Sequence, residues 1–184
     1  MSLKSLHRWN AALLGLFLSL HLANHAALAL GPGAHGAVMA ALRPLYRHPL
    51  IEPVLIALFA AQIGLGLALA WRRGRPMGGW AWAQVLSGLW LALFLVQHVP
   101  AVLLARPATD TGAAFAAAVV QDWPGALYFI PYYIAAVAAL ATHLAAARRF
   151  ARWPAAPGAL ARGLPVAGLL LGVGIVAGLI ALPR

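Results

Sequence analysis

The hydrophobic residues of this chain fall into five long runs separated by short polar segments. A membrane-spanning helix needs about 20 consecutive apolar residues, and each run reaches that length. Glycine, proline and arginine clusters stand between the runs, among them Gly31-Pro32-Gly33 and Arg72-Arg73-Gly74-Arg75. The pattern predicts five transmembrane helices, over residues 10–30, 49–71, 80–104, 126–147 and 163–182.

The composition agrees with a lipid environment. Apolar residues make up 64% of the 184 residues and charged residues only 9%, which leaves too little polar surface to cover a soluble globule of this length. Five spans use about 100 residues, so the loops between them are short. We therefore expect an all-α fold with a single transmembrane domain, residues 1–184.

The net charge of +10 comes from thirteen Lys and Arg residues that lie in the gaps between the apolar runs. This distribution indicates membrane topology and not a nucleic-acid surface, because cytoplasmic loops carry the excess of Lys and Arg. An N terminus in the cytoplasm places nine of them inside and four outside. The sequence therefore predicts a multi-pass protein of the inner (cytoplasmic) membrane with a cytoplasmic N terminus.

The first apolar run has a competing interpretation as a cleaved signal peptide. Lys4 and Arg8 precede it, and Ala27-Leu28-Ala29 imitates a cleavage site. The run is long and carries two histidines, which favours a retained span.

The fifth run contains two pairs of glycines spaced four residues apart, Gly168 with Gly172 and Gly174 with Gly178. Small residues at this spacing allow helix backbones to approach closely in lipid. We expect the fifth run to form a helix that packs against its neighbours, in preference to one with a direct role in a functional site.

Seven histidines and no cysteine define the candidate chemistry. Without cysteine the chain cannot attach a c-type haem or ligate an iron–sulfur cluster. His7, His35 and His48 lie at or beyond span ends, where an imidazole reaches water. An ionisable group inside the hydrocarbon region indicates function by default, although an interhelical hydrogen bond is the alternative. The histidines in or near that region are His21, His25, His98 and His143.

Two of these histidines occupy matching positions in a weak internal repeat. Residues 10–21 and 87–98 align in register, with Phe17 matching Phe94 and His21 matching His98. Imidazoles on facing helices are common axial ligands of haem iron. His143 lies about 8 Å from the inner end of its span, whereas His98 lies near the outer end of its own span. The two histidines therefore cannot readily share one iron.

Two segments resemble the H-R-x-S-G…H openings of a known family. They are His7-Arg8-Trp9-Asn10-Ala11, which precedes His21, and Ser87-Gly88, which precedes His98. This family is the membrane cytochrome b subunits of succinate dehydrogenase and fumarate reductase, specifically the single-chain type with five helices and two haems. The similarity covers most of the chain.

The resemblance implies a haem site among the first four helices. It assigns His21 and His98 as axial iron ligands of the haem nearer the outer face, and His143 as the fourth-helix ligand of the inner haem. The second-helix ligand would fall near Gly66, but the second span offers only Gln62 and Glu52 as polar candidates. One haem b is therefore the expectation over two, with a buried hydrogen-bonding role for His143 as the alternative.

The resemblance also implies an electron-transfer subunit and not a catalyst in its own right. Electrons would pass between a membrane quinone and flavoprotein and iron–sulfur subunits docked on the cytoplasmic side. A bis-histidine iron has no open coordination position, which suits electron transfer.

The outer segment from Arg43 to Glu52 concentrates hydrogen-bonding groups beside the expected outer haem. Arg43 and Arg47 are candidates to pair with haem propionates, and Tyr46 or Glu52 to handle a quinol proton. The alternative is an ordinary interfacial loop in which Glu52 neutralises one arginine.

Two other function classes stay open from the sequence. A haem-free transporter or scaffold would use the histidines to line a polar path, and broken helices would favour it, whereas these spans are unbroken. A free-standing membrane haem protein would work without dehydrogenase partners.

Overall fold

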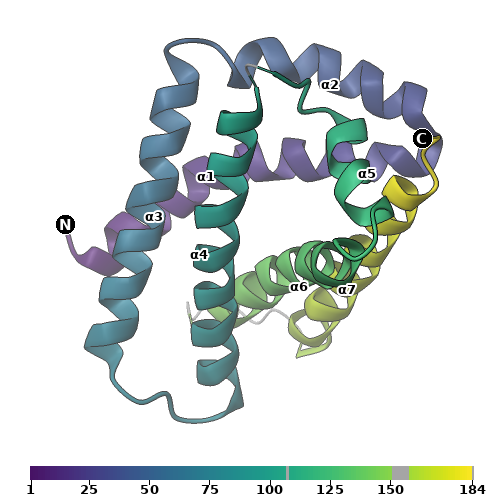
Figure 1. The fold of residues 1–184 in the computed structure, drawn as a ribbon. Coiled ribbons are helices and arrows are strands. Elements are labelled where there is room, and N and C mark those ends of the chain that lie inside the picture. The colour runs from purple at the N-terminus through teal and green to yellow at the C-terminus, as the bar shows by residue number, and fades with distance from the viewer. Residues whose placement is uncertain (107, 151–157, 184) are drawn as a thin grey trace. The chain divides into compact units, whose positions relative to one another are not determined.

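The computed structural model describes residues 1–106, 108–150 and 158–183 (Figure 1). The chain folds into two compact units, Met1–Gly74 and Arg75–Arg184. Every regular element among the described residues is a helix. The all-α prediction is confirmed.

Five helices among the described residues have the length and apolar composition to cross a membrane. Each coincides with one of the five predicted spans. They are Leu3–Leu30, Ile51–Arg73, Gly79–Ala105, Ala126–Phe150 and Ala161–Ile180.

The first unit consists of three α-helices and a short 3₁₀ turn. They are α1 (Leu3–Ala26), η1 (Ala27–Leu30), α2 (Pro32–Tyr46) and α3 (Ile51–Arg73). Ser2 caps α1, since its hydroxyl accepts a hydrogen bond from the Ser5 amide at 3.2 Å. Gly31 adopts φ +103°, a conformation that favours glycine, and Pro32 then starts α2. This turn folds α2 back onto the end of α1.

The helix α2 replaces most of the outer loop that the sequence suggested. Arg43 and Tyr46 lie in its last turn, and the connection to α3 is only the short segment 47–50. A proline in the first turn costs no hydrogen bond, because the first amides of a helix have no partner within it. The Gly-Pro-Gly sequence therefore ends one helix and begins another, where we had expected an irregular segment.

Helices α1 and α3 contact each other in opposite chain directions. His7 of α1 lies against Gly66, and Phe17 lies against Phe59. Between these contacts, Nδ2 of Asn10 donates to the Leu58 carbonyl at 2.8 Å and to Oε1 of Gln62 at 2.7 Å. Polar bonds inside an apolar interface fix the register of the two helices.

The second unit consists of four helices: α4 (Gly79–Ala105), α5 (Ala113–Gln121), α6 (Ala126–Phe150) and α7 (Gly158–Ile180). Helices α4 and α6 are also antiparallel. Ser87 lies beside His143 near one end of the pair, and Gln97 accepts a hydrogen bond from the Tyr128 hydroxyl near the other. The pairs α1–α3 and α4–α6 thus share one arrangement.

The helix α7 packs closely on α6 through two glycines. A Cβ on Gly168 would overlap the Cβ of Ala141, and a Cβ on Gly172 would lie 3.0 Å from the Ile134 carbonyl oxygen. A Cβ on Gly174 would meet nothing within 4 Å. The packing role predicted for the fifth span is confirmed at Gly168 and Gly172.

The end of α7 is held by α5. Nε2 of Gln121 donates to three carbonyls at this end, those of Leu179 (3.1 Å), Ile180 (3.1 Å) and Leu182 (2.8 Å). The last carbonyls of a helix have no partner within the helix, so the Gln121 amide supplies a cap from another element.

Candidate cofactor site

The repeat in the sequence corresponds to a repeat in side-chain geometry. In the first unit the rings of Phe17 and His21 stack, with centroids 5.5 Å apart and planes inclined by 19°. In the second unit Phe94 and His98 stack at 4.9 Å and 17°. Residues four apart share one helix face, and in both units this face presents a phenyl ring against an imidazole.

Each of these phenylalanines is also held by aromatic rings outside its own helix. Phe17 contacts Tyr46 at 5.9 Å and Phe59 at 5.8 Å between ring centroids. Phe94 contacts Tyr132 at 4.8 Å, and the Tyr132 hydroxyl donates to the Phe94 carbonyl at 3.0 Å. Because such contacts restrict ring rotation, the phenylalanines limit the orientations open to the stacked imidazoles.

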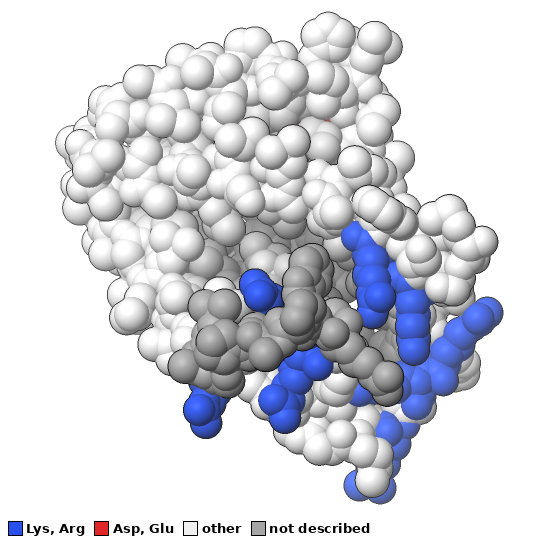
Figure 2. Space-filling model, turned by 180° about the vertical axis from the view of Figure 1, so that it is seen from behind, with Lys and Arg blue, Asp and Glu red and all other residues white. Residues whose placement is uncertain are grey.

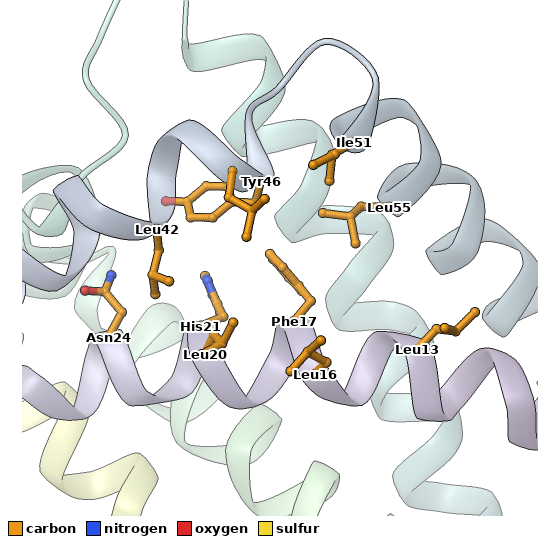
Figure 3. A pocket seen from close by; sticks show the side chains of 11 residues that line it. Leu13, Leu16, Phe17, Leu20, His21, Asn24, Leu42, Tyr46, Ile51 and Leu55 are labelled. Carbon is orange, nitrogen blue, oxygen red and sulfur yellow. The ribbon is translucent and has the colours of Figure 1, made fainter.

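His21 lines a cavity of about 190 Å³ in the first unit. Figure 3 shows its imidazole directed from α1 toward Tyr46 on α2. The polar side chains of the lining are His21, Asn24 and Tyr46. The remaining lining residues are Leu13, Leu16, Phe17, Leu20, Leu42, Leu45, Ile51 and Leu55. Drug-sized ligands occupy about 300–1,000 Å³, so this cavity can enclose only part of such a molecule.

The imidazole of His21 belongs to a row of three. His25 stands edge-on to His21 at 4.7 Å between ring centroids, and His35 lies 5.8 Å from His25. Among the described residues, no group of three His, Cys, Asp or Glu side chains is arranged to hold a metal ion. The row connects α1 with α2 through ring contacts.

His35 is only 2% exposed, so the expectation that it reaches water is wrong. Its Nε2 lies 3.4 Å from Nδ2 of Asn24, and the amide nitrogen can only donate, so the imidazole nitrogen accepts. No periodic pattern in the sequence indicates this contact, because the contact depends on α2 folding back over α1.

Burial, with a smaller contribution from the Arg43 charge, lowers the pKa of His35 from its ordinary 6.5. A lowered folded-state pKa means that the unfolded chain binds the proton more readily. The stabilising effect of neutral His35 is thus complete above about pH 6.5 and declines as the pH falls toward the folded-state pKa. We expect the unfolding temperature of the protein in detergent to fall on acidification over this range.

The matched variants for this pH effect are His35→Gln and His48→Gln. Glutamine at residue 35 can still bond to Asn24 but does not titrate, so its unfolding temperature should depend less on pH. His48 is exposed and its replacement should preserve the wild-type profile. Parallel profiles for wild type and His35→Gln would show that another group controls the acid sensitivity.

In the second unit, His143 is held in one tautomer. Its Nδ1 lies 3.0 Å from the Gln84 carbonyl oxygen and 3.2 Å from Oγ of Ser87. A carbonyl only accepts, so Nδ1 carries the hydrogen and Nε2 keeps its lone pair. A Cβ on Gly88 would lie 3.0 Å from Cε1 of His143, so glycine permits this close approach. A histidine that ligates a metal is typically oriented by a hydrogen bond from its other ring nitrogen, like the bond from Nδ1 of His143 to the Gln84 carbonyl.

The first unit has a different polar group in the equivalent place. Asn10, which matches Ser87 in the repeat, bonds to Gln62 of α3, just as Ser87 contacts His143 of α6. Nε2 of Gln62 in turn donates to Nε2 of His7 at 3.3 Å. Gln62 is thus the counterpart of His143, and the space beside Gly66 is taken by the His7 ring.

The other predicted site residues are dispersed around the cavity. Tyr46 lines it, whereas Arg43, Arg47 and Glu52 are not among its lining residues. Arg43 donates to Sδ of Met39 on α2 at 3.0 Å, and Glu52 lies in the first turn of α3. Of the four residues proposed for propionates and quinone, Tyr46 is the one that shares a cavity with His21.

His98 and His143 are far apart within the second unit. His143 contacts Ser87, which precedes His98 by eleven residues, or about 16 Å along α4. The expectation that these two histidines do not bind one iron is consistent with this spacing.

Comparison with protein-family models, curated proteins and solved structures finds no match to this chain. The function is therefore inferred from the residues of the chain and from their geometry.

Proposed function

We propose that the chain is a haem b-binding membrane anchor that passes electrons between a membrane quinone and a complex of the succinate dehydrogenase or fumarate reductase type. His21 and His98 would hold the haem iron in this proposal. The observation that carries it is the pair of matched Phe–His stacks, one in each unit. Equivalent imidazoles from two repeats are the donor set that a six-coordinate haem requires.

The residues around His21 fit a haem group. The imidazole enters a cavity lined mostly by leucine, isoleucine and phenylalanine, which suits an apolar macrocycle. The cavity is smaller than such a group, so it would receive one edge, with the remainder covered by other parts of the chain or by lipid. When bound between two imidazoles, haem b exchanges single electrons and offers no open position for oxygen.

The protein contributes orientation and a dry environment. Phe17 and Phe94 set the planes of the two imidazoles, and the leucines around His21 exclude water from its ring. Arg43 and Arg47 lie on or just after α2 and would pair with the propionates. His143, with its lone pair on Nε2, would be the ligand at a second haem. Gln62 in the equivalent place of the first unit makes one haem the expected number.

Tyr46 is the best-supported quinone contact. Its ring lines the His21 cavity, and its hydroxyl can donate to a quinone carbonyl or pass on a quinol proton. Glu52 follows on α3 as a second proton-handling group. A quinone near Tyr46 would be next to the histidine proposed to bind haem, which favours electron transfer between the two.

The flavoprotein and iron–sulfur partners would dock on the cytoplasmic side, where nine of the thirteen basic residues fall in the proposed inner-membrane topology. On the face shown in Figure 2, nearly all charged side chains are Lys or Arg. Such a surface is complementary to acidic partner subunits.

The test is the reduced-minus-oxidised visible spectrum of the chain purified in detergent after expression with ample haem. We expect haem b bands and about one haem per chain. Two haems per chain would assign His143 as a ligand despite Gln62. A protein without haem bands would reject the proposal and favour a transporter or scaffold. Co-purification of flavin and iron–sulfur polypeptides would separate a complex subunit from a free-standing haem protein.

A further inference from the structure

One end of the first unit gathers basic side chains from two helices. Lys4 and Arg8 lie in the first turns of α1, and Arg72 and Arg73 form the last turn of α3. All four are exposed. We call these four residues the basic end of the first unit.

The antiparallel contact between α1 and α3 brings these helix ends together. His7 lies against Gly66, and Lys4 is only three residues before His7 along α1. Arg72 and Arg73 follow Gly66 by about 10 Å along α3. Figure 1 shows the start of α1 and the end of α3 on the same side of their crossing. The bonds from Asn10 to Leu58 and Gln62 lock this register.

Two tryptophans border the basic end. Trp9 is 66% exposed and Trp71 is 88% exposed. Exposed indole rings at span ends are typical of the lipid headgroup level. Glu52, the one acidic residue in the sequence of this unit, lies at the opposite end of α3. The basic end therefore lies at the end of the unit that is remote from Glu52.

We propose that the basic end of the first unit binds the headgroups of anionic phospholipids. Arginine pairs with phosphate through two parallel hydrogen bonds, and Lys4 adds a compact charge. Tryptophan beside these cations places them at headgroup depth. The occupant is a lipid and not a soluble anion because the exposed apolar surfaces of Trp9 and Trp71 continue into the membrane-spanning helices. This binding is independent of haem and quinone.

The test is native mass spectrometry of the full chain released from nanodiscs of mixed phosphatidylglycerol and phosphatidylcholine. We expect wild type to retain phosphatidylglycerol in preference to phosphatidylcholine. Arg72→Gln with Arg73→Gln should reduce that preference at least about fivefold, since each cation near an anionic surface contributes about this factor. The matched control is Arg43→Gln with Arg47→Gln, which removes the same charge from the other end of the unit and should change it little.

Salt provides a second readout. The preference of wild type should weaken in high salt, because exposed charges are screened there. An unchanged preference in the Arg72/Arg73 variant, or an equal loss in the Arg43/Arg47 variant, would overturn the proposal. Binding of a polyglutamate peptide that phosphatidylglycerol does not displace would assign the surface to an acidic protein and would also overturn it.

Discussion

Haem b content should fall at least about tenfold when either His21 or His98 is replaced by alanine. Under the proposed function the change removes an iron ligand, and even the groups that only orient metal ligands contribute about 10–100-fold to affinity. Both single variants should lose haem to a similar degree, since one iron needs both imidazoles. The measurement is haem absorbance per chain after purification in detergent.

Two further substitutions and a rescue experiment make this result specific. His48→Ala alters an exposed histidine outside the cavity and should keep full haem content. Added imidazole should restore part of the spectrum of His21→Ala by filling the vacated position. His25→Ala tests the neighbouring ring of the same row. Full loss in His25→Ala with normal haem in His21→Ala would show that the ligand is one turn further along α1.

The second large effect is expected at the α6–α7 contact. Gly168→Ala should destabilise the protein by about 1–3 kcal/mol, because overpacking a close interface forces the backbones apart. The added Cβ would overlap the Cβ of Ala141 and lie 3.0 Å from the Val137 carbonyl oxygen. The measurement is the unfolding midpoint in mixed detergent and denaturant.

Gly174→Ala is the matched control on the same helix. Its added Cβ meets nothing within 4 Å, and alanine favours helix over glycine, so stability should stay the same or rise by up to about 1 kcal/mol. Gly172→Ala should behave like Gly168→Ala, since its Cβ would crowd the Ile134 backbone. Equal stability of Gly168→Ala and Gly174→Ala would mean that α7 does not depend on this contact.

The five long apolar helices were the most predictable part of the fold. Their apolar runs are long enough to identify without any knowledge of packing, and Gly168 and Gly172 were recognisable as a packing motif from their spacing alone. By contrast, α2 was missed because Gly-Pro-Gly usually indicates irregular structure. Once Pro32 occupies the first position of a new helix, the same residues begin an element.

The candidate site was predictable only in part. The matched positions of Phe17 with His21 and of Phe94 with His98 were visible as a sequence repeat. Neither the burial of His35 nor the equivalence of Gln62 with His143 was visible. Both depend on which residues of two distant helices meet. Asn10 and Gln62 are 52 residues apart, and only the register of α1 against α3 brings them together.

The Gln121 cap has a consequence for how the chain adapts to bilayer thickness. The fifth span lies in α7, which at 23 residues is about 34 Å long, little more than the hydrocarbon layer. In a thicker bilayer the last carbonyls of such a helix would be drawn away from water. The Gln121 amide already satisfies those of Leu179 and Ile180. In such a bilayer these two carbonyls would keep a hydrogen-bond partner within the protein, whether or not water reached them.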